Sequence, residues 1–227
     1  MSWQEWAREV EVEPSLYAAD FARLGEQIET LLEAGVRVFH FDVGDGHFVE
    51  PITVGPIVLK SISSIVRARG GALDCHLMIE TPEKHLEAVA EAGGDSVTVH
   101  YEACHDLPGV IAQARELGLG VGVAFNPESE PEDAVAATAG AEVDLFLCMS
   151  IHPGYSGQPF MPEALPRLRR LRQLVGAGVH VQVDGGVGLE NIRASRESGA
   201  TLFVAGTSIF GGPDLAEAYR QLVQALE

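Results

Sequence analysis

The sequence predicts an α/β fold, a single (β/α)8 TIM barrel. Eight short apolar or alternating runs are separated by stretches with helical spacing, from one end of the chain to the other. The 227 residues are close to the about 250 that such a barrel typically needs. The glycine-rich turns come late, whereas the alternative, a doubly wound open sheet, usually has fewer strands and a glycine-rich first turn. We therefore expect one domain over residues 1–227, with residues 1–11 as an N-terminal extension.

Each expected element follows from a local pattern. Asp20 can cap a helix whose Leu24, Ile28 and Leu31 share one face, and Gly35 can end it. Similar helical spacing fills the gaps between the later strands and the end of the chain. The expected strands cover residues 12–18, 36–43, 72–79, 96–100, 119–125, 143–149, 179–183 and 202–204.

Composition and charge exclude several classes of partner. The formal net charge is −18, and Lys60 and Lys84 are the only lysines. Such an acidic surface repels nucleic acid and anionic membranes, so we expect neither as a partner. An anionic substrate would need local positive potential from backbone N–H groups, helix N-termini or a bound cation. The three cysteines without a CxxC spacing, and the lack of a signal peptide or a long apolar run, predict a cytoplasmic protein.

Polar residues stand at the ends of three expected strands. Strand alternation places His40 and Asp42 on one face of the second strand, and Asp74, His76 and Met78 on one face of the third. Asp184 ends the seventh strand. The two imidazoles and two of these three carboxylates suit one divalent cation, zinc first, with iron, manganese or cobalt also admissible. The alternative is a hydrogen-bonded network in the core that holds no metal.

Glycine-rich turns follow the last three expected strands. These turns contain the segments Gly154-Tyr155-Ser156-Gly157, Gly185-Gly186 and Gly206-Thr207. Glycine lets backbone N–H groups approach an anion closely, and phosphate is commonly held in this part of a barrel. Tight turns occur in any barrel, but three in succession favour an anion site.

A metal beside carboxylates, facing an anion site, fits a ketose phosphate as substrate. The metal would acidify the C–H next to the carbonyl. One of Asp42 and Asp184 would remove that proton, and the other would return one on the opposite face. No organic cofactor is needed.

Longer segments are distributed along the chain in a characteristic order. They are Pro14-Ser15-Leu16, Ala19-Asp20-Phe21, His40-Phe41-Asp42-Val43, Asp45-Gly46-His47-Phe48-Val49, His76-Leu77-Met78, Pro153-Gly154, Gly157-Gln158, Val183-Asp184-Gly185-Gly186-Val187 and Ala205-Gly206-Thr207. In these segments the chain resembles the ribulose-phosphate 3-epimerase family, from Pro14 to about Gly211. The resemblance implies conversion of D-ribulose 5-phosphate to D-xylulose 5-phosphate in the pentose phosphate pathway, by a dimer or hexamer.

The resemblance also implies a role for each matching position. His40, Asp42, His76 and Asp184 would bind the metal, and Asp42 and Asp184 would also be the two acid/base catalysts. The residues implied at the substrate site are Ser15, His76, Met78, Met149, Gly154, Tyr155, Ser156, Gly157, Gly185, Gly186, Gly206 and Thr207.

Three departures from the family pattern concern the substrate. Gly44 stands where methionine is usual, Tyr155-Ser156 replaces Phe-Gly, and His152 replaces Asn, Asp or Glu. The smaller Gly44 could admit a six-carbon ketose such as allulose 6-phosphate, unless a neighbouring side chain fills the space. A non-catalytic sugar-phosphate-binding paralogue is a more remote alternative.

Other conspicuous residues are expected to be structural. An aldolase or decarboxylase of this fold would need a lysine at a strand end, and neither lysine is placed there. Asp45 is expected to order a loop, His100 and His105 to be structural, and Cys75 to be a packed thiol. Trp3 and Trp6 could cover the barrel floor or a subunit contact.

Overall fold

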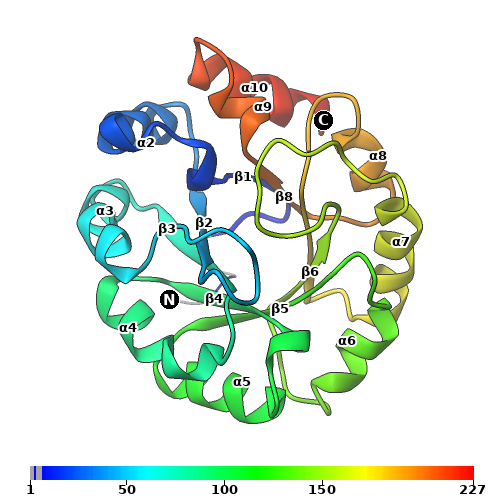
Figure 1. Ribbon diagram of the computed structural model, residues 1–227. Helices are drawn as coiled ribbons and strands as arrows, with labels where there is room; N and C mark the ends of the chain where they lie inside the picture. Colours follow the sequence, from blue (N-terminus) through cyan, green and yellow to red (C-terminus); the bar gives the residue numbers. More distant parts are fainter. Residues whose placement is uncertain (1–2, 4–6) are drawn as a thin grey trace.

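The computed structural model describes residues 3 and 7–227 and contains one sheet of eight parallel strands. The strand order is β1-β8-β7-β6-β5-β4-β3-β2, and a single bridge between Ser15 and His40 joins the two outer strands. The sheet is thereby a nearly closed barrel, and the helices form a ring around it (Figure 1). The predicted (β/α)8 barrel is confirmed.

The elements alternate in the order expected. The strands are β1 (Glu11–Pro14), β2 (Val38–Gly44), β3 (Ala72–Met78), β4 (Ser96–His100), β5 (Gly120–Phe125), β6 (Leu145–Met149), β7 (His180–Asp184) and β8 (Leu202–Ala205). The helices are α2 (Leu24–Glu33), α3 (Pro56–Ala68), α4 (Leu86–Ala92), α5 (Leu107–Glu116), α6 (Pro131–Ala137), α7 (Ala164–Leu174), α8 (Ile192–Glu197), α9 (Thr207–Phe210) and α10 (Leu215–Ala225). Short 3-10 helices are η1 (Leu16–Ala18), η2 (Phe21–Arg23), η3 (Pro82–Lys84) and η4 (Tyr101–Ala103).

The first strand is shorter than predicted. It ends at Pro14, and the segment expected to continue it forms η1. Ser15 N makes a last bond to Ala205 O, after which Ala18 N bonds back to Ser15 O. The chain turns here because its amides bond locally rather than to a neighbouring strand, so Ser15 lies at the mouth of the barrel.

The first helix begins as its sequence pattern indicates. The Asp20 side chain accepts a hydrogen bond from Ala22 N and caps η2, which leads directly into α2. Gly35, with φ of 104°, stands just past the end of α2.

Apolar residues form two separate layers. One lies between the sheet and the helices and includes the outward-facing Phe41, Cys75 and Val123. The other lies inside the barrel and contains Trp3 packed with apolar residues of β2, β3, β5, β6 and β8. Trp3 therefore covers the barrel floor, while Trp6 falls outside the described residues. Within the described chain, no helix has the length and apolar character to span a bilayer.

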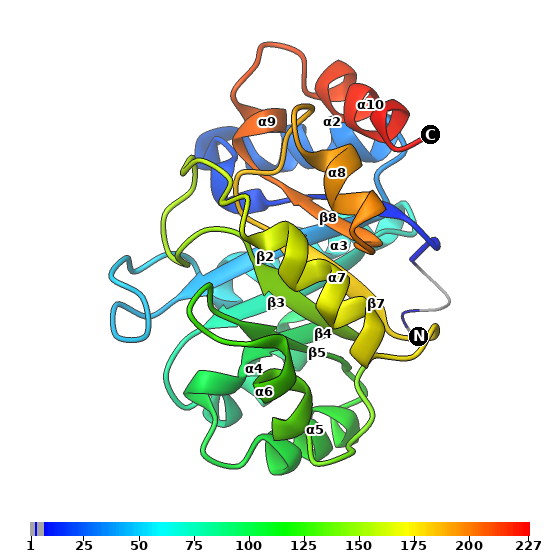
Figure 2. The same cartoon turned by 90° about the vertical axis from the view of Figure 1, so that its right-hand side faces the viewer.

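The lumen is polar on one side and apolar on the other. Strands β5, β6 and β8 contribute apolar side chains such as Ala124, Leu147 and Leu202. Strands β1 to β4 and β7 contribute buried polar groups, among them Glu13, Asp74 and Gln182. The loops after β2 and β6 project from the same end of the barrel (Figure 2). The site lies at this end, where the strands finish.

Candidate active site

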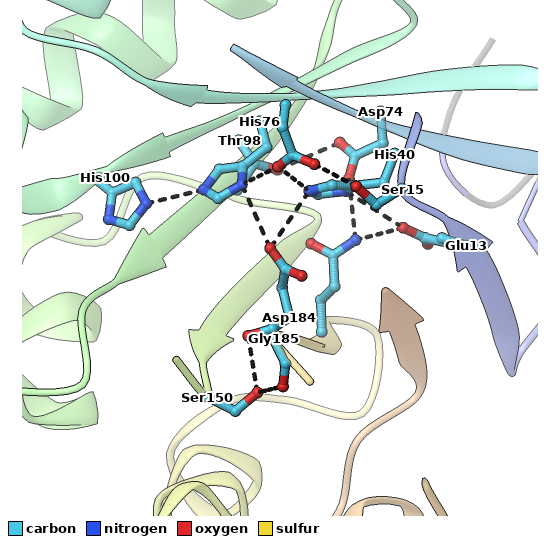
Figure 3. A network of polar contacts seen from close by, with 12 residues as sticks. Glu13, Ser15, His40, Asp74, His76, Thr98, His100, Ser150, Asp184 and Gly185 are labelled. Atoms are coloured by element: carbon cyan, nitrogen blue, oxygen red, sulfur yellow. Dashed lines mark hydrogen bonds and ion pairs between the residues drawn. The ribbon is translucent and has the colours of Figure 1, made fainter. Parts of the chain in front are cut away.

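Four of the predicted side chains converge inside the barrel. His40 and Asp42 come from β2, His76 from β3 and Asp184 from β7, and one donor atom of each lies within 4.8 Å of the others. Asp42 Oδ1 is 3.0 Å from His76 Nδ1 and 3.3 Å from His40 Nε2. Asp184 Oδ2 is 3.8 Å and 4.0 Å from the same two nitrogens. Figure 3 shows His40, His76 and Asp184 turned toward one another.

This group fits a divalent cation. His40 Nε2 is buried and makes no hydrogen bond to any described residue, although it faces two carboxylates. An orphaned buried nitrogen of this kind is costly unless a ligand occupies it. Two imidazole nitrogens and two carboxylate oxygens are a donor set that zinc accepts.

The two carboxylates of the group differ in acidity. Burial opposes ionisation of Asp42, but His40 and His76 outweigh it and hold the pKa of Asp42 well below its ordinary value. Burial and the negative charge of Asp42 raise the pKa of Asp184 to about 7. Two carboxyl groups whose pKa values are pushed apart can serve as an acid and a base at neutral pH.

Asp74 pairs with His40 across β2 and β3, one layer below Asp42 and His76, and holds the His40 ring in place. It accepts hydrogen bonds from Ser96 Oγ at 2.7 Å and Gln182 Nε2 at 3.0 Å, and it lies 3.1 Å from His40 Nδ1. Gln182 Nε2 also donates to Glu13 Oε2 at 2.5 Å. Sequence alternation placed Asp74 inside the barrel but did not single out Gln182 or Glu13, although each lies two residues before a predicted site residue.

Glu13 is a fully buried acid whose Oε2 lies 3.9 Å from His40 Nδ1. Burial, and then the charge of Asp74, raises the pKa of Glu13 well above its ordinary value, although His40 partly offsets this. Burial therefore favours the protonated form of Glu13.

Serine side chains position the two aspartates. Ser15 Oγ donates to Asp42 Oδ2 at 2.6 Å, beside the bridge that joins β1 to β2. Ser150 Oγ donates to the backbone carbonyls of Asp184 and Gly185, at 2.8 and 2.7 Å. Ser15 was predicted at the site and Ser150 was not, because its contact is with the backbone of another strand.

A pocket opens above the aspartates. Every predicted substrate-site residue lines it except His76, which lies beneath, fully buried. Among its described lining residues there is no lysine or arginine. The lining residues are Ser15, Tyr17, Asp42, Met78, Met149, Ile151, Gly154, Tyr155, Ser156, Gly157, Asp184, Gly185, Gly186, Val187, Val204, Gly206 and Thr207.

Two glycines of this pocket are constrained in different ways. Gly186 has φ of 63°, and a Cβ there would lie 2.5 Å from Phe160 N, so any side chain would be both strained and obstructed. Gly206 has an ordinary φ of −99°. A Cβ at Gly206 would lie 3.2 Å from Ser156 Oγ, inside the pocket itself. The turns after β7 and β8 thus bring backbone close to the space that a ligand would occupy.

The space beside Gly44 is filled by the loop that follows β2. A Cβ at Gly44 would lie 2.9 Å from both Pro51 O and Val49 Cγ2, and 3.2 Å from Thr53 Cγ2. Thr53 N also donates to Gly44 O at 3.1 Å. Gly44 does not line the pocket, so its small size makes room for the loop rather than for a larger ligand.

Three other expectations can be compared with the structure. Asp45 accepts hydrogen bonds from the amides of His47, Phe48 and Glu80 and so orders its loop as predicted. Burial raises the pKa of the outward-facing Cys75 thiol well above its ordinary value, which keeps it protonated. His100 lies in the lumen, with Nε2 2.9 Å from His76 Nε2, and so contacts the site.

Solved structures with this fold include enzymes of other classes. The 3-hexulose-6-phosphate synthase of Salmonella typhimurium superposes with a TM-score of 0.73 at 17% identity, covering 95% of this chain and 98% of that one. The orotidine 5′-phosphate decarboxylase of Pyrococcus horikoshii gives 0.66 at 15% identity, covering 95% and 98%. These similarities support the fold alone. In this chain Lys60 and Lys84 are exposed, on α3 and η3, and neither lines the pocket.

Sequence relatives identify the family. Residues 11–210 match the Ribulose-phosphate 3 epimerase family. The chain is 42% identical to the ribulose-phosphate 3-epimerase of Synechocystis sp. over 217 residues, covering 93% of this chain and 92% of the relative. It is 36% identical to the enzyme of the same name from Bacillus subtilis, covering 94% and 98%. Together with the barrel and the His and Asp group at its mouth, these matches show that the chain belongs to the ribulose-phosphate 3-epimerase family.

Proposed function

We propose that this protein interconverts D-ribulose 5-phosphate and D-xylulose 5-phosphate by epimerisation at C3, with one divalent cation per chain. The observation that carries the proposal is the convergence of His40, Asp42, His76 and Asp184 within 4.8 Å, at the base of a glycine-rich pocket. The relatives named above carry the same activity in their names.

Asp42 and Asp184 are the proposed acid and base. A bound cation would polarise the substrate carbonyl and so acidify the adjacent C3–H. Strands β1 and β8 lie between β2 and β7 in the sheet, so the two carboxylates approach from different sides. One carboxylate removes the proton from C3 of the ketose, which leaves a planar enediolate, and the other carboxyl group delivers a proton to the opposite face of C3. The opposite pKa shifts of the pair suit one protonated and one ionised partner.

The remaining pocket residues are proposed to hold the substrate. Met78 and Met149 offer polarizable, apolar contact beside the carboxylates. The turns containing Gly186, Gly206 and Thr207 line the far wall, where backbone N–H groups can bind the phosphate without a cationic side chain. Local dipoles of this kind overcome the repulsion expected from the acidic surface.

A five-carbon substrate is preferred to a six-carbon one because the loop fills the space at Gly44. The test is to compare kcat/KM for D-ribulose 5-phosphate and D-allulose 6-phosphate, using zinc-loaded protein of known metal content. We expect the pentulose to be favoured. A preference for the hexulose would overturn the substrate assignment. Metal-loaded protein inactive on both would instead indicate the non-catalytic paralogue.

A further inference from the structure

We propose that His100 and Glu102 are positioning residues that set the tautomer of His76, so that His76 Nδ1 presents a lone pair to the cation. This inference rests on the proposed metal site. It assigns a role to two residues outside the pocket lining and the proposed ligand group.

The three side chains form a continuous row from the proposed metal site to the start of η4. His76 Nδ1 faces Asp42 and Asp184, and His76 Nε2 lies 2.9 Å from His100 Nε2. His100 Nδ1 faces Glu102 Oε2 at 3.4 Å. Figure 3 shows His100 on the far side of His76 from Asp184.

Hydrogen-bond chemistry gives this row one direction. An ionised carboxylate only accepts hydrogen bonds, so Glu102 favours a proton on His100 Nδ1. His100 Nδ1 makes no hydrogen bond to any described residue, which leaves this carboxylate as the acceptor available to it. His100 Nε2 is then an acceptor, and it favours a proton on His76 Nε2. The lone pair of His76 consequently stays on Nδ1, the nitrogen that faces the proposed cation.

The contact between His76 and His100 opposes a competing contact between His76 and Asp42. Asp42 Oδ1 lies 3.0 Å from His76 Nδ1 and would by itself favour a proton on that atom, which would block metal binding. His100 offers the other nitrogen of the same ring an acceptor at a similar distance. A second partner that fixes the tautomer in this way is common for metal-binding histidines.

Both positioning residues are held rigidly. The rings of His76 and His100 stack at 5.0 Å with an interplanar angle of 25°, and Phe48 packs on His100 at 4.8 Å. Glu102 Oε1 accepts hydrogen bonds from Asn126 N at 2.7 Å and Ser129 Oγ at 2.6 Å, which leaves Oε2 for His100.

The test compares zinc affinity and histidine tautomer in full-length variants. The changes are His100→Leu, which removes the acceptor, His100→Gln, which retains one, and Glu102→Gln. His180→Gln is the matched control, because His180 is a half-buried histidine bonded to Thr201 and outside the proposed ligand group. Zinc dissociation constants come from chelator competition, and long-range ¹H–¹⁵N spectra report which nitrogen of His76 carries the proton.

We expect His100→Leu and Glu102→Gln to weaken zinc binding roughly 10- to 100-fold. His100→Gln should recover part of the loss, and His180→Gln should stay close to wild type. The zinc-loaded wild type should show a proton on His76 Nε2. Wild-type affinity in folded His100→Leu, or zinc bound through Nε2, would overturn the inference.

Two controls separate this inference from the proposed function. If His100→Leu does not fold, Glu102→Gln carries the test, because Glu102 is only partly buried and lies outside the lumen. If the wild type binds no zinc, the proposed metal site fails, and the spectra of the zinc-free chain then decide the inference. A proton on His76 Nε2 would support the inference that Glu102 and His100 set the tautomer of His76. A proton on Nδ1 would refute it.

Discussion

The two sides of the barrel mouth carry different kinds of residue. Around the ends of β2, β3 and β7, charged side chains gather, with two aspartates and two histidines in one group. Around the turns that follow β6, β7 and β8, the pocket wall contains glycines, Ser156 and Thr207. We call these regions the charged side and the glycine side.

Under the proposed function, this difference would let an acidic protein act on an anionic substrate. Proton transfer needs ionisable groups with shifted pKa values, and the charged side supplies them by burying carboxylates beside imidazoles. Anion binding needs only oriented N–H groups at close range, which glycine permits. We therefore expect substitutions on the charged side to lower mainly kcat, and those on the glycine side to raise mainly KM.

The largest expected effect is that of Asp184→Asn on the charged side. Asparagine can still offer an oxygen to a metal but cannot exchange a proton, so kcat for D-ribulose 5-phosphate should fall about 10²- to 10⁴-fold. The measurement is steady-state turnover, with metal content and circular dichroism as controls for site and fold. Substantial residual turnover at full metal loading would refute the two-aspartate assignment.

Ser15→Ala should have the next largest effect. It removes the 2.6 Å hydrogen bond to Asp42. Since a hydrogen bond to a charged group contributes about 1.5–3 kcal/mol, kcat/KM should fall roughly 10- to 100-fold. Ser195→Ala is the matched control, because Ser195 is equally buried but bonds to Asn191 O near the start of α8. Equal losses in both variants would mean that the effect is one of general stability.

Gly186→Ala tests the glycine side. The positive φ and the contact with Phe160 should displace the turn, so KM should rise about 10-fold while kcat changes little. Gly140→Ala is the control, since Gly140 has φ of 84° and nothing within 4 Å of its added Cβ. A fall in kcat at unchanged KM would contradict the division between the two sides.

The smallest effect on activity is expected for Glu13→Gln, below the charged side. Because the folded-state pKa of Glu13 is raised, its contribution to stability is fully present below the unfolded-state pKa and is lost as the pH rises through the folded-state value. Glutamine mimics the neutral acid and cannot ionise. The free energy of unfolding of the variant, relative to that of the wild type, should therefore increase as the pH rises from 5 to 9. Urea titrations of the metal-free proteins at several pH values in this range measure the difference. A constant difference across this range would show that Glu13 is not held neutral.

Local periodicity predicted the fold, and the family resemblance selected the four proposed metal ligands among the inward-facing polar residues. Alternation assigns His40, Asp42 and His76 to the inner face without knowledge of any partner. It did not identify the contact of Gln182 with Glu13, which joins residues 169 positions apart, or the role of Ser150. It also left open the space at Gly44, because the loop that fills it has no periodic pattern.

The sequence by itself determined which side chains face the lumen and at which strand ends they stand, because a two-residue period and the turn residues are local properties. Only the tertiary structure decided how deep each side chain lies. The register between β2 and β3 places His76 level with Asp42, and it places Asp74 level with His40, one layer below. The bridge between Ser15 and His40 closes the barrel at this level. Those offsets depend on how the whole sheet curves, and they determine which nitrogen of each histidine faces the proposed cation.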